Sequence, residues 1–178
     1  FSNGTGATAC LACHAQSVSP AESGWQSECE CVAGYQNAGG DMCAACAVGK
    51  SKPEVSHAAC ALCAAGSFQN ETAQPECLAC GVSSTSEPNR VYCECDAGHT
   101  SAHPGVLLSA PVCEPCAADT YKEGLGPEAC DACGLFMRSP VAAVLQAQCL
   151  CDEGYFFTGV YDTCVACAAG TFKATVSN

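Results

Sequence analysis

Cysteine is the residue type with the greatest capacity for chemistry in this sequence, which has 20 cysteines among 178 residues. Seven pairs have the spacing C-x(2)-C and three have the spacing C-x-C. Two C-x(2)-C pairs, such as Cys60/Cys63 and Cys77/Cys80, have a separation at which four thiolates can bind zinc. A single C-x(2)-C pair can also catalyse thiol–disulfide exchange. The third possible use is a framework of structural disulfides.

The pattern favours disulfides over the other two uses. Zinc binding gives no role to the C-x-C pairs, and a redox pair would need a βαβ setting that is not recognisable in this sequence. The share of cysteine is also above the level that marks a disulfide scaffold. We therefore expect structural disulfides, with zinc as the lesser alternative, and we expect no bound metal or other cofactor.

The remaining chemically capable side chains form no recognisable site. The four histidines share no register in the repeats; they are His14, His57, His99 and His103. Several carboxylates stand near the C-x-C pairs, namely Glu28, Glu30, Glu94, Asp152 and Glu153. Calcium is an alternative to plain solvated charge there, but no alternating acidic ligand loop is present. No nucleophile elbow or phosphate-binding glycine loop occurs, so we do not expect an enzyme.

Two sequons are the only candidate modification sites to which we assign a role. "NGT" begins at Asn3 and "NET" begins at Asn70, and both have the form N-x-[ST]. Each lies two residues beyond an aromatic residue, Phe1 or Phe68, at the same position of similar segments. We expect N-linked glycans at both, with plain turn asparagines as the alternative.

Charge and composition restrict the class of partner and compartment. The net charge of −12, with only six lysines and arginines, argues against nucleic acid or an anionic membrane as partner. No apolar run approaches the ~20 residues that a membrane-spanning helix needs, so we expect no membrane contact in this segment. Chains rich in disulfides mature in oxidising compartments. We therefore expect an extracellular or cell-surface location.

Large apolar residues are too scarce to build an ordinary core. Leu, Val and Phe together number 28, and Ile is absent. Such a chain buries too little apolar surface to offset its conformational entropy, so that cross-links must replace the core. The expected fold class is a linear array of small disulfide-rich modules, irregular with short β-hairpins and little helix. The phrase C-x-C-x(2)-G-aromatic predicts one such hairpin. Aromatic residues such as Tyr35, Tyr155, Phe68 and Tyr121 are expected to cover the disulfides.

The cysteine spacing is periodic. Cys46/Cys60, Cys63/Cys77 and Cys116/Cys130 each enclose thirteen residues, and these segments alternate with C-x-C-x(2)-G phrases. A period of about fifty residues indicates a repeat array. The predicted domains are a module truncated at its start (1–45), a single extra loop (46–62), two complete modules (63–115 and 116–166) and the start of a further module (167–178). The same rule places partners for Cys10 and Cys167 outside the sequence, and we expect a fragment of a longer repetitive protein.

The simplest pairing joins consecutive cysteines. It gives Cys13–Cys29, Cys31–Cys43, Cys46–Cys60, Cys63–Cys77, Cys80–Cys93, Cys95–Cys113, Cys116–Cys130, Cys133–Cys149 and Cys151–Cys164. Only Cys10 and Cys167 then lack a partner. A crossed arrangement, with Cys133 bound to Cys151 and Cys149 bound to Cys164, remains open because sequence does not fix connectivity.

The segment from Cys130 to Lys173, "CDACGLFMRSPVAAVLQAQCLCDEGYFFTGVYDTCVACAAGTFK", resembles the cysteine-rich repeat of ephrin receptors. "CLCDEGY" is also similar to the closing half of domains like that of epidermal growth factor, and tumour-necrosis-factor-receptor modules are a more distant likeness. The sequence departs from the pattern at His99, where tyrosine is usual, and at the extra loop Cys46–Cys60. The resemblance implies an extracellular array without catalytic residues, as in large surface glycoproteins of algae and protists, including those of flagellar hairs (mastigonemes).

The function that we expect from these observations is structural. The chain would be a segment of a large secreted repeat glycoprotein that forms an extracellular filament, coat or flagellar hair. Its partners would be neighbouring modules of the same chain, other copies and N-linked glycans. The alternative is a cysteine-rich stalk or ligand-binding region of a cell-surface receptor.

Overall fold

The computed structural model describes residues 8–40, 42–106, 108–159 and 163–178. The chain divides into two compact units. Unit 1 comprises Phe1–Cys80 and Ser86–Cys93, and unit 2 comprises Gly81–Thr85 and Glu94–Asn178. These units are larger than the predicted modules, whose boundaries stay a prediction.

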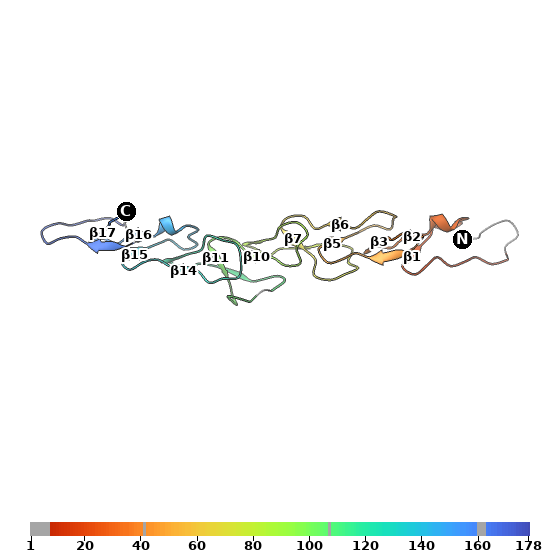
Figure 1. The fold of residues 1–178 in the computed structure, drawn as a ribbon, viewed down its shortest axis with the longest axis horizontal. Coiled ribbons are helices and arrows are strands. Elements are labelled where there is room, and N and C mark those ends of the chain that lie inside the picture. The colour runs from red at the N-terminus through yellow and green to blue at the C-terminus, as the bar shows by residue number, and fades with distance from the viewer. Residues whose placement is uncertain (1–7, 41, 107, 160–162) are drawn as a thin grey trace. The chain divides into compact units, whose positions relative to one another are not determined.

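Unit 1 is built of two-stranded antiparallel sheets that follow one another in chain order (Figure 1). The pairs are β1–β2, β3–β4, β5–β6 and β7–β8. The strands are β1 (Ser17–Val18), β2 (Glu30–Cys31), β3 (Tyr35–Asn37), β4 (Cys43–Ala45), β5 (Lys50–Ser51), β6 (Ala61–Leu62), β7 (Ser67–Phe68) and β8 (Leu78–Ala79). A 3₁₀ turn, η1 (Gln26–Glu28), precedes β2.

Unit 2 repeats the same plan with the pairs β9–β10, β11–β12, β13–β14, β15–β16 and β17–β18. Its strands are β9 (Ser84–Thr85), β10 (Glu94–Cys95), β11 (His99–Ser101), β12 (Cys113–Pro115), β13 (Thr120–Tyr121), β14 (Asp131–Ala132), β15 (Met137–Arg138), β16 (Leu150–Cys151), β17 (Tyr155–Phe157) and β18 (Cys164–Ala166). The 3₁₀ turn η2 (Gln146–Gln148) precedes β16. The expected fold class, small disulfide-rich modules with short β-hairpins and little helix, is confirmed.

The two 3₁₀ turns have the same local cause. In η1 the Glu28 side chain accepts hydrogen bonds from the backbone N–H groups of Gly24 and Trp25, at 2.7 and 2.8 Å. In η2 the Gln148 side chain accepts the equivalent bonds from Val144 and Leu145. In both cases the side chain of the last residue of the turn binds the N–H groups of the two residues that precede the turn, and a cysteine follows directly.

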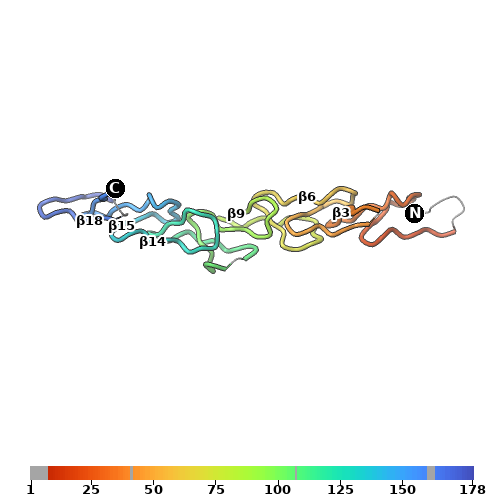
Figure 2. The backbone as a smooth tube through the Cα atoms, in the orientation of Figure 1, coloured from red at the N-terminus to blue at the C-terminus, as the bar shows by residue number. Residues whose placement is uncertain are grey.

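The C-x-C-x(2)-G-aromatic phrase does not form a hairpin of its own, and that prediction is wrong. In the first copy, β2 pairs backwards with β1 while β3 pairs forwards with β4. Gly34 lies between them with a positive φ of 80°, so the chain turns from one hairpin into the next. The phrase therefore joins two hairpins, which Figure 2 shows as successive narrow loops of the backbone within the unit.

Half-cystines take the place of a conventional hydrophobic core. Most of the buried apolar side chains among the described residues are cysteines, and the others are Phe68, Met137 and Ala143. In unit 2, Tyr121 and Tyr155 pack against a buried cluster that contains Met137 and Cys149. The expectation that these tyrosines cover disulfides is thus confirmed there. Within the described residues, no helix is long and apolar enough to cross a bilayer.

Candidate functional site: the array of braced loops

Nine disulfides close the chain into successive loops, each between one cysteine and the next along the chain. They are Cys13–Cys29, Cys31–Cys43, Cys46–Cys60, Cys63–Cys77, Cys80–Cys93, Cys95–Cys113, Cys116–Cys130, Cys133–Cys149 and Cys151–Cys164. Among the described residues, Cys10 and Cys167 are in no disulfide. We call the first cysteine of each loop its opening cysteine and number positions from it.

Every loop begins with the same β-turn. The residue three positions after the opening cysteine has a positive φ in all nine loops and in the segment that begins at Cys167. These residues are Gln16, Gly34, Gly49, Gly66, Ser83, Gly98, Asp119, Phe136, Gly154 and Gly170. In each turn the N–H of the fourth position donates to the carbonyl of the first, as from Tyr35 to Val32 at 3.1 Å. A positive φ at the third residue is the mark of a type II turn.

Hydrogen bonds join each turn to the next loop. The N–H of Cys46 donates to the carbonyl of Gly34 at 2.8 Å, and the N–H of Gly34 donates to the carbonyl of Lys52 at 2.8 Å. The same reciprocal pair links Cys116 and Lys122 to Gly98, again at 2.8 Å each. Consecutive loops are therefore held in one register by main-chain bonds as well as by the covalent chain.

Loops two steps apart also touch, at backbone that leaves no room for a side chain. A Cβ placed on Gly34 would lie 2.2 Å from the carbonyl oxygen of Ala73, which belongs to the second loop ahead. A Cβ on Gly98 would lie 2.5 Å from the carbonyl oxygen of Ala142. Glycine is required at these two turns because of this close approach, and it also adopts the positive φ without strain.

A lysine binds three carbonyl oxygens at each junction that follows a C-x-C phrase, and it is buried at two of these junctions and partly buried at the third. Lys52 is 3 % exposed, and its Nζ donates to the carbonyls of Cys31, Tyr35 and Ser56 at 2.9, 2.7 and 2.7 Å. The first two acceptors belong to the preceding loop and the third to the loop of the lysine itself. Three donors of one ammonium group are thus satisfied by main-chain oxygens alone.

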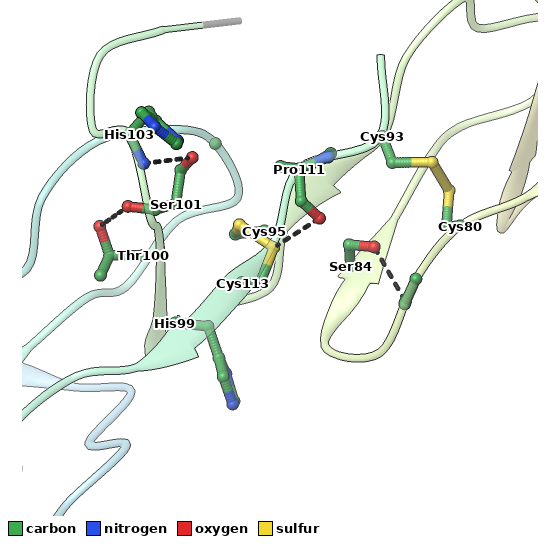
Figure 3. The surroundings of a disulfide bond; sticks show 12 residues. Cys80, Ser84, Cys93, Cys95, His99, Thr100, Ser101, His103, Pro111 and Cys113 are labelled. Atoms are coloured by element: carbon green, nitrogen blue, oxygen red, sulfur yellow. Dashed lines mark hydrogen bonds between the residues drawn. A yellow bond between two sulfur atoms is a disulfide. The ribbon is translucent and has the colours of Figure 1, made fainter. Parts of the chain in front are cut away.

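The same arrangement recurs twice in unit 2. Lys122 is 5 % exposed and donates to the carbonyls of Cys95, His99 and Gly126 at 3.4, 2.8 and 2.7 Å. Lys173 donates to the carbonyls of Cys151 (3.3 Å), Tyr155 (2.7 Å) and Ser177. Since the acceptor at the aromatic position is a backbone oxygen, His99 serves as well as tyrosine. In Figure 3 the His99 side chain points away from the sulfur atoms of Cys95 and Cys113.

Burial sets the electrostatics of two of these lysines. Desolvation lowers the pKa of Lys52, and the nearby Glu30 opposes that shift. Desolvation likewise lowers the pKa of Lys122 against the charges of Glu128, Glu94 and Asp96. An ammonium in this setting relies on its carbonyl partners, because burial without hydrogen bonds disfavours the charged form.

The arginine ion pair of unit 2 is of a different kind. The Arg138 guanidinium is exposed and donates to the Asp152 carboxylate, which raises the pKa of Arg138. An exposed pair of this type contributes little to stability. The acidic side chain near that C-x-C phrase is therefore engaged with a cation of the chain itself.

The structure leaves the other candidate side chains apart. The described residues hold no group of three His, Cys, Asp or Glu side chains that could bind a metal ion. His14 contacts Gln26, and His57 contacts the carbonyl of Ser27, at 3.0 and 3.2 Å. The four cysteines of the zinc alternative, Cys60, Cys63, Cys77 and Cys80, are all in disulfides, and zinc requires thiolates.

The structure describes one of the two sequons, the one at Asn70. Asn70 is exposed, directly after the buried Gln69 in the loop Cys63–Cys77. The side-chain amide of Gln69 donates to the carbonyl of Glu76 at 2.7 Å and accepts from the N–H of Glu71 at 3.0 Å, which fixes the path of the sequon. Asn3 lies outside the described residues.

Comparison with known proteins identifies the type of repeat. Residues 49–90 match the sequence profile of the family described as "Tyrosine-protein kinase ephrin type A/B receptor-like". The resemblance to ephrin-receptor-type repeats is thereby confirmed, on a stretch that includes the turns at Gly49, Gly66 and Ser83.

A curated relative carries a similar repeat. The chain is 35 % identical over 81 residues to "Cysteine repeat modular protein A" of Toxoplasma gondii. The aligned residues cover 45 % of this chain, while the chain spans only 2 % of that relative's length. Together with nine disulfides, these matches indicate a cysteine-rich repeat module of an extracellular or secreted kind.

Proposed function

We propose that this chain is a structural segment of a large secreted repeat glycoprotein. In this proposal the braced loops build an extracellular filament, a coat or a flagellar hair of the mastigoneme type. The chain catalyses no reaction and needs no cofactor. Its contacts are with further loops of the same chain and with other copies of it.

The observation that carries the proposal is the repetition of one junction. Each opening turn has a positive φ at its third residue, between 57° and 87°, and each turn of the nine closed loops is bonded to the segment that follows, as Gly34 is to Cys46 and Gly98 to Cys116. Because these turn-to-loop hydrogen bonds join main-chain groups, the same bond can form at every junction along the chain, whatever side chains the turn carries. Solenoid-like arrays derive their stability from such neighbour contacts.

Glycans on the exterior belong to the same proposal. The exposed sequon at Asn70 stands in a loop whose path is fixed by Gln69, so a glycan there would project from a rigid base. Asn3 occupies the equivalent sequence position and is proposed as a second acceptor. The net charge of −12 would add to the hydration of such a surface.

The second candidate function is a stalk or ligand-binding region of a cell-surface receptor. It is favoured by the match of residues 49–90 to the ephrin-receptor-like family. It requires a membrane anchor elsewhere in the full protein, whereas the filament proposal requires self-assembly.

Immunogold electron microscopy separates the two functions. Antibodies raised against the 178-residue chain would be applied to intact cells of the source organism and to the material sheared from them. The structural proposal predicts gold particles repeated along filaments, hairs or a surface layer in the sheared fraction. Label that stays with the plasma membrane would support the receptor instead, and label found only on a soluble monomer would overturn the structural proposal.

A further inference from the structure

The residue six positions after each opening cysteine differs with the kind of loop that precedes it. We call a loop a C-x-C loop when its opening cysteine is the second cysteine of a C-x-C pair, as at Cys31, Cys95 and Cys151. Lysine stands at the sixth position of each described loop or segment that directly follows a C-x-C loop, at Lys52, Lys122 and Lys173. Loops that follow any other loop have a residue other than lysine there, and these residues are Asn37, Gln69, Ser86, Ser101, Ser139 and Phe157.

The side chains of Ser86 and Ser139 make fewer bonds than lysine at this position. Each donates one hydrogen bond to the preceding loop, from Ser86 to the carbonyl of Ser67 at 2.7 Å and from Ser139 to that of Thr120 at 3.0 Å. Those acceptors are at the fourth position, the same position as Tyr35 and its equivalents, which accept from lysine. Gln69 instead bonds within its own loop.

The lysine side chain extends further into the preceding loop than the serine side chain does, because a C-x-C loop presents a second carbonyl acceptor. Lys52 continues past the carbonyl of Tyr35 to that of Cys31, the opening cysteine of the preceding loop. An ammonium with three partners fits this site. A shorter hydroxyl would leave a buried acceptor without its donor, which is unfavourable.

The three carbonyl oxygens that accept from one lysine are called the carbonyl triad. We infer that the carbonyl triad is an ammonium site that specifies loop order, so that only a loop with lysine at its sixth position packs correctly behind a C-x-C loop. During oxidative folding, the residue at the sixth position then determines whether its loop packs on the preceding loop. This inference goes beyond the proposed function and holds whether the chain serves a filament or a receptor.

Oxidative refolding of the full 178-residue chain tests the inference. The variants Lys52→Met and Lys122→Met keep the length of the side chain but remove the ammonium. Lys50→Met, two residues away in β5, is the matched control. After refolding, the disulfides are mapped by proteolysis and mass spectrometry without reduction.

We expect disulfide mispairing to be confined to the two loops that meet at the mutated lysine. Lys52→Met should lower the yield of Cys31–Cys43 and Cys46–Cys60 by about tenfold, and Lys122→Met should do the same to Cys95–Cys113 and Cys116–Cys130. Lys50→Met should leave all yields within about twofold of the parent. Equal yields in Lys52→Met and Lys50→Met, or mispairing spread evenly over all loops in both lysine variants, would overturn the inference.

Amine labelling of the unmodified chain tests the site without any variant. Acetylation by an N-hydroxysuccinimide ester should be at least about tenfold slower at Lys52 and Lys122 than at Lys50, because their ammonium groups are buried and bound. Comparable rates at the three lysines would contradict the carbonyl triad itself.

Discussion

Gly34 and Ala73 approach so closely that a Cβ on Gly34 would lie 2.2 Å from the Ala73 carbonyl oxygen. Gly66 occupies the same turn position with a similar positive φ, 77° against 80°, yet a Cβ there would meet nothing within 4 Å. The two glycines therefore separate the effect of backbone conformation from that of close packing. They provide a matched test of contacts between loops two steps apart.

Gly66→Ala should lower the free energy of unfolding by about 1–2 kcal/mol, since alanine resists a positive φ. Gly34→Ala should lower it by about 1–3 kcal/mol more, because the Ala73 backbone must also move. Guanidinium titration with the disulfides intact, followed by near-UV circular dichroism, measures both. Equal losses in the two variants would show that the packing of Gly34 on Ala73 does not exist in solution.

At two turns whose third residue is not glycine, we predict that substitution by glycine changes the free energy of unfolding in opposite directions. Ser83→Gly should raise the free energy of unfolding by up to about 1 kcal/mol, because glycine adopts the φ of 57° without strain. Phe136→Gly relieves a similar φ of 60° but removes a ring stacked on Tyr155 at 4.2 Å, and should therefore be destabilising. Thermal unfolding of both variants is the measurement. A stabilised Phe136→Gly would contradict the stacking.

Reduction should remove the fold altogether. Because most buried apolar side chains are half-cystines, the reduced chain has too little apolar surface to stay folded. A loop of about 15 residues contributes ~3 kcal/mol in the chain-entropy picture, and nine such contributions are lost together. Circular dichroism after reduction and alkylation should show an unfolded chain. Retained near-UV signal and slow amide exchange would show a core that does not depend on sulfur.

Asn70 should carry an N-glycan when the chain is secreted from a eukaryotic host. Treatment with an amidase that removes N-glycans should increase electrophoretic mobility. Asn70→Gln and Thr72→Ala should each abolish that glycan, while Asn37→Gln, at an exposed asparagine outside any sequon, should not. Intact mass before and after deglycosylation reads out the occupancy. An Asn70 found unmodified in the secreted chain would refute this assignment.

The sequence predicted the class of fold because cysteine spacing and glycine placement are visible in one dimension. Gly49 and Gly66 mark their turns, but Gln16 and Phe136 adopt the same positive φ with no local signal of it. Their conformation is imposed by the disulfides and by bonds to neighbouring loops, as in the donation from Val32 to the carbonyl of Gln16 at 3.0 Å. The positive φ of these two residues is therefore set by tertiary contacts and not by the preference of the residue type.

The lysine junction could not be predicted from residue type. A lysine among polar neighbours normally indicates a solvated surface, and Lys52 differs from Lys50 only in its position. The available signal was positional, since each of Lys52, Lys122 and Lys173 follows its opening cysteine by six residues in a loop behind a C-x-C pair. The role of these lysines can be recognised only in the structure, which shows the carbonyls of the preceding loop that accept their hydrogen bonds.

Non-reducing peptide mapping of the secreted chain tests the central claim most directly. Proteolysis under acidic conditions, which prevent exchange, followed by mass spectrometry would identify each linked pair of peptides. The account predicts links between consecutive cysteines throughout, including Cys133–Cys149 and Cys151–Cys164. Links of Cys133 to Cys151 and of Cys149 to Cys164, or thiols that remain free or bind metal along the chain, would contradict it.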